Sequence, residues 1–183
     1  MPTSDTAPDE LDGLLGGLSA REGCLLTLGM GLTRLGRINE LLFERSAGEC
    51  GLNGSEATTL VALSMSGPPH RMLPSEIRRQ IAHTSAGVSG ILRRLEAEGL
   101  VERQPDPSDG RRVFVTITPA GDEIVRRFVR QHAVLLGTCL ADVDDAGLVG
   151  HTDALDALLA PLERHAGFAP ALRRARAAAG RSV

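Results

Sequence analysis

The arginines in the middle of the chain are the residues whose type and spacing best suit the binding of a polyanion. Arg93 and Arg94 are adjacent in one predicted helix, and Arg111 and Arg112 are adjacent in a predicted hairpin. A guanidinium donates its hydrogen bonds in a fixed fork that suits a phosphate. Residues 71–118 hold eight Arg against six acidic residues, whereas the whole chain has a net charge of −3. This stretch is therefore predicted to face nucleic-acid phosphates.

The helix that carries Arg93 is predicted over Ser85–Glu98. Its apolar residues recur at the spacing of one buried helical face, and Gly99 is a good terminator; the apolar residues are Val88, Ile91, Leu92 and Leu95. The other side carries small or hydrogen-bonding groups that let a helix end approach base edges. Taken alone, the pattern also fits an ordinary surface helix. The candidate DNA contacts here are Thr84, Ser85, Ala86, Gly87, Ser89, Gly90, Arg93 and Arg94.

A β-hairpin is predicted directly after this helix. Residues 100–104 and 112–118 alternate between apolar and polar types, and the segment PDPSDGR between them contains an Asp-Gly turn. Such a hairpin is typical of a wing, in which Arg111 enters the minor groove, Asp109 braces it and Arg112 adds a contact. A plain surface hairpin is the alternative. A short helix over Pro74–Ile81, a turn, a helix and a hairpin follow the order of a winged helix-turn-helix.

The segments on both sides of this module are predicted to be long amphipathic helices. Leucines recur at helical spacing over residues 11–18 and 22–45, and apolar stripes recur over residues 119–139 and 144–165. An isolated monomer would expose these stripes, so pairing across a two-fold axis is expected. The fold class is therefore mainly α with a small β-hairpin wing. The predicted regions are a disordered N-terminus (1–10), N-terminal dimerisation helices (11–50), a winged helix-turn-helix (51–118), C-terminal dimerisation helices (119–166) and a basic, Ala-rich tail (167–183).

Several classes of protein fit the sequence poorly. The chain has no run of 18 apolar residues and no signal-peptide pattern at its start, so a cytoplasmic protein that does not contact a membrane is expected. The three cysteines are widely spaced and form no CxxC pair, so neither a disulfide framework nor a structural metal site is indicated. No phosphate-binding loop, paired carboxylates or catalytic triad is evident, so we expect no enzyme and no cofactor.

Residues 74–121 resemble the MarR family of bacterial transcriptional regulators, through TSAGVSGILRRLEAEGLVER, PDPSDGR and VTITPAG. The resemblance implies a homodimer with an α-helical dimerisation region from both chain ends, and a winged helix-turn-helix in each subunit that reads half of a pseudo-palindrome in double-stranded DNA. It places the family's recognition helix on Ser85–Glu98 and its wing residues on Asp109 and Arg111. The family commonly has longer, often basic, side chains where this chain has Gly90 and Gly110. Arg93, Arg103 and Arg112 are the residues able to compensate.

The resemblance also implies a small-molecule effector that changes the separation of the two recognition helices. The chain lacks Trp and Tyr, so the expected pocket is aliphatic with Arg or His at its polar end. His70 and Arg71, at the joint before the winged module, are the candidate ligand residues. The leading hypothesis is a ligand-responsive repressor.

Three other hypotheses remain open. A thiol switch would use Cys24, although family members that sense peroxide employ tyrosine partners that this chain lacks. A metal sensor would use His132 and Cys139, two turns apart, without an evident third ligand. A winged helix that binds proteins instead of DNA is favoured by Gly90 alone.

Overall fold

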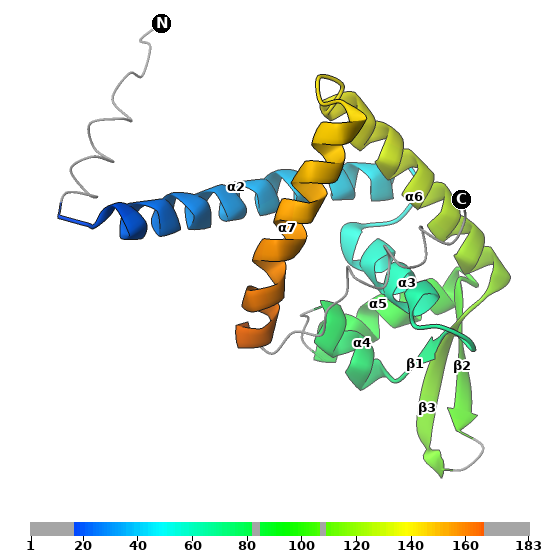
Figure 1. Cartoon of the computed structure of the whole chain (residues 1–183). Helices are drawn as coiled ribbons and strands as arrows, with labels where there is room; N and C mark the ends of the chain where they lie inside the picture. Colours follow the sequence, from blue (N-terminus) through cyan, green and yellow to red (C-terminus); the bar gives the residue numbers. More distant parts are fainter. Residues whose placement is uncertain (1–16, 82–84, 107–108, 167–183) are drawn as a thin grey trace, which may run out of the picture. The chain divides into compact units, whose positions relative to one another are not determined.

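The computed structural model describes residues 17–81, 85–106 and 109–166. It confirms the predicted fold class, a mainly helical chain with a small antiparallel sheet (Figure 1). The chain divides into two units between Arg45 and Ser46, and each is described separately. The elements are α2 (Ala20–Gly48), α3 (Gly54–Met65), β1 (Arg71–Met72), α4 (Pro74–Ile81), α5 (Ser85–Ala97), β2 (Val101–Asp106), β3 (Asp109–Ile117), α6 (Pro119–Cys139) and α7 (Asp145–Ala166).

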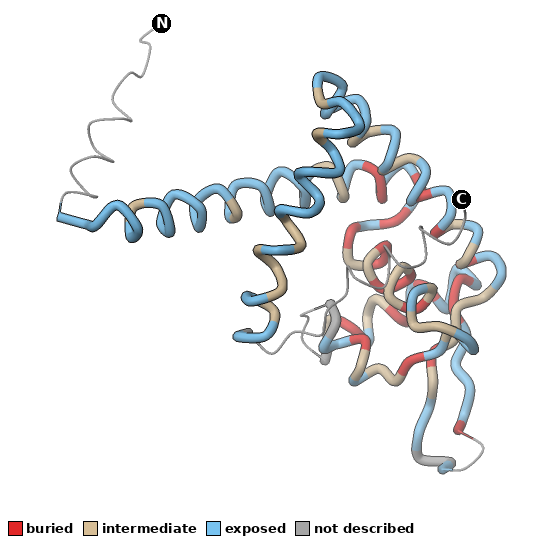
Figure 2. The backbone as a smooth tube through the Cα atoms, in the orientation of Figure 1, coloured by how far each residue is buried: buried red, intermediate tan, exposed pale blue. Residues whose placement is uncertain are grey.

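The described part of the first unit comprises residues 17–45, and nearly all of it is helix α2. It starts two residues before the predicted start, because Ser19 and Glu22 form a capping box: the Ser19 amide donates to the Glu22 carboxylate at 2.8 Å. Most of its side chains are exposed (Figure 2). Its glycines have open surroundings, since a Cβ added at Gly29, Gly31 or Gly36 would meet no atom within 4 Å.

The second unit holds the core. Helices α3, α4 and α5 and strand β3 contribute its largest fully buried apolar side chains, which are Leu60, Leu63, Ile77, Leu92, Leu95 and Val115 (Figure 2). Helix α3 begins at a capping box in which the Asn53 side chain accepts from the Glu56 amide and Glu56 accepts from the Asn53 amide. Helix α5 ends one residue earlier than predicted, and Gly99 follows with φ of +69° as expected of a terminator.

The sheet has three strands in the order β1-β3-β2, so the prediction of a two-stranded hairpin was incomplete. Strand β1 pairs Arg71 with Thr116 and Met72 with Val115. Two residues are too few to show an alternating pattern, which is why the sequence did not reveal this strand. Strands β2 and β3 pair antiparallel with a register shift between Pro105 and Asp106.

Helices α6 and α7 follow the sheet. Thr118 caps α6 by accepting the Gly121 amide at 3.1 Å. Helix α7 continues past Pro161 to Ala166, so the proline does not end the helix. Both helices expose large apolar side chains, among them Val129, Val134 and Val149.

The predictions for residues 1–10, for residues 11–16 of the short helix predicted over 11–18 and for the tail 167–183 lie outside the described residues. Gly17 and Leu18, the last two residues of that predicted helix, are described and are not helical. Within the described ranges, no helix combines the length and apolar character needed to span a bilayer.

Candidate nucleic-acid interface

Helix α5 separates a buried face from a face of small and basic residues. Val88, Leu92 and Leu95 are buried, as predicted, whereas Ser89 and Arg93 are exposed. Gly87 and Gly90 are half-buried. A Cβ at Gly90 would meet no atom within 4 Å, so the surface over this glycine is open. Of the other predicted contacts in this helix, the structure gives only the backbone of Ser85 and Ala86, and Thr84 lies outside the described residues.

Arg94, the neighbour of Arg93, forms ion pairs with two glutamates of the same protein. Its Nε lies 3.2 Å from a carboxylate oxygen of Glu56 and 3.1 Å from one of Glu98. The hydrogen bond that Arg94 donates to Glu98 and the negative charge of Glu56 raise the pKa of Arg94 above its ordinary value. The adjacent arginines predicted to act alike thus have different surroundings.

The wing carries an ion pair that sequence reasoning missed. Arg112 lies 3.7 Å from the carboxylate of Asp106, which is buried at the end of β2. The guanidinium carbon of Arg112 also lies 5.5 Å from the centre of the Phe114 ring. Asp109 begins β3 and is exposed, while for Arg111 the structure gives only the backbone. The predicted brace of Arg111 by Asp109 therefore remains a prediction.

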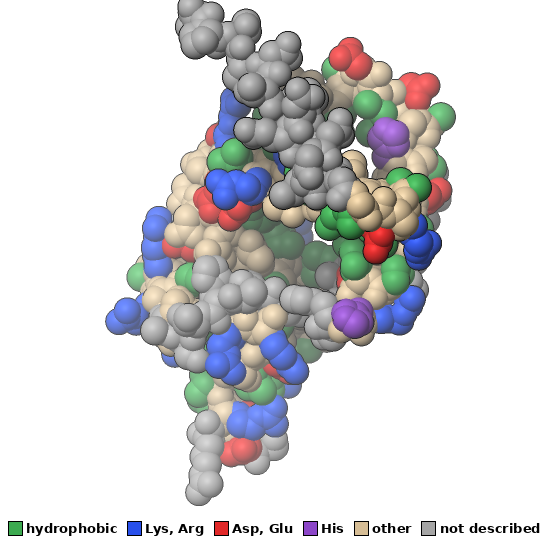
Figure 3. Space-filling view, turned by 90° about the vertical axis from the view of Figure 1, so that its left-hand side faces the viewer, with side chains coloured by type: hydrophobic (Ala, Val, Ile, Leu, Met, Phe, Trp, Pro, Cys, Tyr) green, Lys and Arg blue, Asp and Glu red, His purple; other side chains and the backbone are tan. Residues whose placement is uncertain are grey.

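Arg103, which was predicted to compensate for DNA contacts missing at Gly90 and Gly110, links the wing to helix α5. Its Nε lies 3.1 Å from Glu96 of α5, which joins strand β2 to the surface of that helix. Arginines also gather in the lower half of the face shown in Figure 3, with acidic side chains among them. Surface pairs of this kind contribute little to stability, so their main effect is on the position of the charges.

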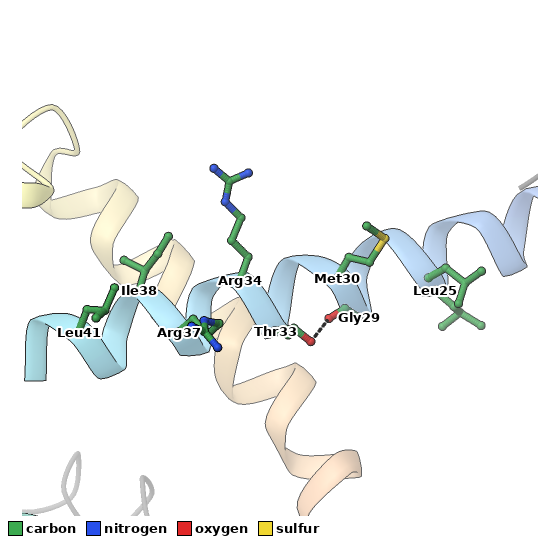
Figure 4. Close-up of a pocket in the computed structure, with 9 residues that line it drawn as sticks. Leu25, Gly29, Met30, Thr33, Arg34, Arg37, Ile38 and Leu41 are labelled. Carbon is green, nitrogen blue, oxygen red and sulfur yellow. Dashed lines mark hydrogen bonds between the residues drawn. The ribbon is translucent and has the colours of Figure 1, made fainter. Parts of the chain in front are cut away.

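The two predicted ligand residues lie at β1. Arg71 stacks over the Phe114 ring, with 4.3 Å between the guanidinium carbon and the ring centre. The Nδ1 atom of His70 is buried and has no hydrogen-bond partner in the described structure. A shallow, open hollow lies along one helix, α2, where apolar side chains flank Arg34 and Arg37 (Figure 4). It matches the expected aliphatic lining with arginine, but His70 and Arg71 do not line it.

The cysteines occupy different surroundings. Cys24 is exposed on α2, Cys139 is exposed at the end of α6, and Cys50 is buried. Among the described residues, no group of three His, Cys, Asp or Glu side chains is arranged to hold a metal ion.

A polar cluster joins the end of α2 to α6, and sequence reasoning did not find it. The Cys50 thiol donates to Gln131 at 2.8 Å, and the Ser46 hydroxyl lies 3.1 Å from Nδ1 of His132. Arg127 donates to the Cys50 carbonyl oxygen at 3.0 Å. Burial lowers the pKa of His132 below its ordinary value. These groups are more than 75 positions apart in sequence, so spacing could not reveal the cluster.

Comparisons with known proteins agree with the winged-helix geometry. Residues 51–112 match the model of the MarR family. The chain is 35% identical over 80 residues to the transcriptional repressor NicR of Pseudomonas putida; the match covers 44% of this chain and 49% of NicR, about half its length.

Two solved structures share the fold. BpsR of Bordetella bronchiseptica, whose DNA binding is regulated by 6-hydroxynicotinic acid, has a TM-score of 0.58 at 24% identity, over 72% of this chain and 98% of BpsR. Sco3205 of Streptomyces coelicolor, a MarR family regulator in complex with DNA, has a TM-score of 0.61 at 22% identity, over 79% of this chain and 93% of Sco3205.

Proposed function

The winged helix of this chain belongs to the MarR family, and from that premise we propose that the protein is a sequence-specific DNA-binding transcriptional repressor that acts as a homodimer. The observation that carries the proposal is the surface of α5. Its core side is filled by Val88, Leu92 and Leu95, which leaves Ser89 and Arg93 exposed on the opposite side. A helix with this division can enter a major groove with its small side chains toward the bases.

The wing supplies the second part of the contact. We expect Arg111 and Arg112 to lie along the minor groove beside the recognition helix, where a narrow groove attracts arginine. Each subunit then reads one half of a pseudo-palindrome.

The effector is proposed to be an organic anion with an apolar body. The hollow along α2 supports this class, since Leu25, Met30 and Leu41 provide apolar contacts and Arg34 and Arg37 provide positive charge (Figure 4). The BpsR example, in which a small aromatic acid regulates DNA binding, supports the same class. Such a ligand shifts the dimer between DNA-fitting and non-fitting states by its differential affinity for them.

Footprinting on the DNA that flanks the gene tests the proposal. We expect one protected region with approximate two-fold symmetry, and the absence of protection at low salt by a folded dimer would exclude the function.

The wing is tested separately with Arg111→Ala, which is expected to weaken binding while the dimer persists. Arg130→Ala is the matched control, because Arg130 is an exposed arginine on α6 that pairs with Glu123. If the two variants bind DNA with equal affinity, the wing is not part of the DNA contact surface.

A further inference from the structure

Arg94 links three segments of the second unit. From the last turn of α5, its Nε lies between Glu56 of α3 and Glu98, the residue directly after α5, at 3.2 and 3.1 Å. Its Nη2 also donates to the Gly51 carbonyl oxygen at 3.5 Å, in the loop before α3. The loop is held from the other side by Arg127 of α6, which donates to the neighbouring Cys50 carbonyl oxygen. Two arginines from different helices thus hold consecutive carbonyl groups.

Glu56 explains why Arg94 is needed in this place. The Glu56 side chain is 2% exposed, so its carboxylate has lost nearly all contact with water. One oxygen accepts the Asn53 amide at 2.9 Å and completes the cap of α3, and the other faces Arg94. A buried carboxylate without a positive partner is strongly destabilising. The charge of Arg94 is therefore required inside the fold.

We propose that Arg94 is a positioning residue that fixes the recognition helix α5 against α3 and the Cys50–Gly51 loop, and that it does not contact DNA phosphates. The Arg94 side chain is 52% exposed, but its Nε is held between Glu56 and Glu98. The exposed Arg93, one position earlier, takes the phosphate role. This inference rests on the proposed function, because it assigns roles within the DNA-reading surface. It replaces the sequence-based view in which both arginines face DNA.

The first experiment needs no DNA. Thermal unfolding is measured for Arg94→Gln, for Glu56→Gln and for the double variant. We expect both single variants to lower the Tm, and the double variant to lower it by clearly less than the sum, because the two side chains act through one contact. Arg93→Gln is the matched control and should leave the Tm nearly unchanged. Additive effects of Arg94→Gln and Glu56→Gln would overturn the pairing.

The second experiment measures DNA binding below the unfolding temperature of every variant, on a duplex selected by the wild-type protein from a random pool and on an unselected duplex. Removing a phosphate contact reduces the slope of log affinity against log salt by about one. We expect this change for Arg93→Gln and not for Arg94→Gln. Instead, Arg94→Gln should lower the preference for the selected duplex by about tenfold, within the range of coupling between contacting residues.

Arg94→Lys separates positioning from a merely structural effect, since it keeps the charge facing Glu56. We expect it to restore part of the preference for the selected duplex. A reduced salt slope for Arg94→Gln would make Arg94 a phosphate contact and overturn the inference. If the folded wild-type protein selects no duplex, the proposed function fails, while the thermal experiment still decides whether Arg94 and Glu56 act together.

Discussion

Gly90 is a glycine of the recognition helix α5 that has open space around it. It lies inside α5, and no atom lies within 4 Å of an added Cβ. Gly90→Ala should therefore stabilise the free protein by about 0.5–1 kcal/mol, since glycine is costly within a helix. If the α5 backbone approaches the bases here, the methyl group will also weaken binding to the selected duplex several-fold. The two effects are measured by chemical denaturation and by DNA titration.

Gly150→Ala provides the control for Gly90→Ala. Gly150 lies within α7, and a Cβ there also meets nothing within 4 Å. The control should gain stability without losing affinity. Unchanged DNA affinity in Gly90→Ala would show that the helix backbone stays away from the base edges at this point.

His132 should make stability depend on pH. Burial lowers its pKa in the folded state below the ordinary 6.5, so the unfolded chain binds the proton more readily. The neutral form is therefore favoured by folding, and its contribution is complete above about pH 6.5 and is lost as pH falls toward the folded-state pKa. We expect the Tm to decrease through this range. His132→Gln should flatten that part of the curve.

The control for this prediction is His151→Gln, which removes an exposed histidine from α7. Differential scanning calorimetry at a series of pH values compares the two variants with the wild-type protein. An equally steep decrease in His132→Gln would assign the pH dependence to other groups.

The junction between the sheet and α6 is fixed by one glycine. At Gly121, an added Cβ would overlap the Leu100 carbonyl oxygen and lie 2.8 Å from Cγ1 of Ile117. Thr118 ties the same junction, because its hydroxyl donates to the Gly99 carbonyl oxygen at 2.7 Å. Gly121→Ala should destabilise the protein by about 1–3 kcal/mol or more, since the backbone of Leu100 cannot yield easily. Urea denaturation measures this loss of stability. A denaturation midpoint equal to that of the wild-type protein would show that α6 shifts to make room for the methyl group.

Among the elements, sequence patterns predicted those whose periodicity spans several turns or several strand residues. Helix α5 and strands β2 and β3 were found within a few residues, because apolar residues recur along their sequences at helical or at strand spacing. Strand β1 was missed since two residues carry no period. The pairings of Arg94 with Glu56 and of Arg112 with Asp106 were also missed, because both depend on the tertiary fold and on register.

At the scale of the molecule, α2 is apolar on two faces. The leucines at helical spacing that predicted a helix over residues 22–45 form a first stripe, which includes Leu28 and Leu35. The hollow follows a second stripe through Leu26, Met30 and Leu41. The first stripe is evident from the sequence. The second stripe is not, because Arg34 and Arg37 interrupt its apolar pattern. A helix that is apolar on most sides is usually enclosed. Both faces of α2 are therefore expected to be covered in the functional assembly.

Dimerisation through α2 is tested by placing a charge on the first stripe. Leu35 is 54% exposed in the single chain, and a two-fold axis would bury it in both copies. We expect Leu35→Glu to raise the dimer dissociation constant by about tenfold or more, because burying an unpaired charge costs well over about 1.4 kcal/mol. Sedimentation equilibrium measures this constant. Thr27→Glu adds the same charge between the two stripes and should leave the dimer intact.

The same variant connects assembly to DNA reading. A monomer can reach one half-site only, so Leu35→Glu should lose affinity for the selected duplex more than for an unselected duplex. The loss should diminish as protein concentration rises and the dimer re-forms. If Leu35→Glu remains dimeric and binds like the wild-type protein, the interface does not include this stripe of α2. In that case the apolar faces of α6 and α7 become the surfaces on which a second copy must be sought.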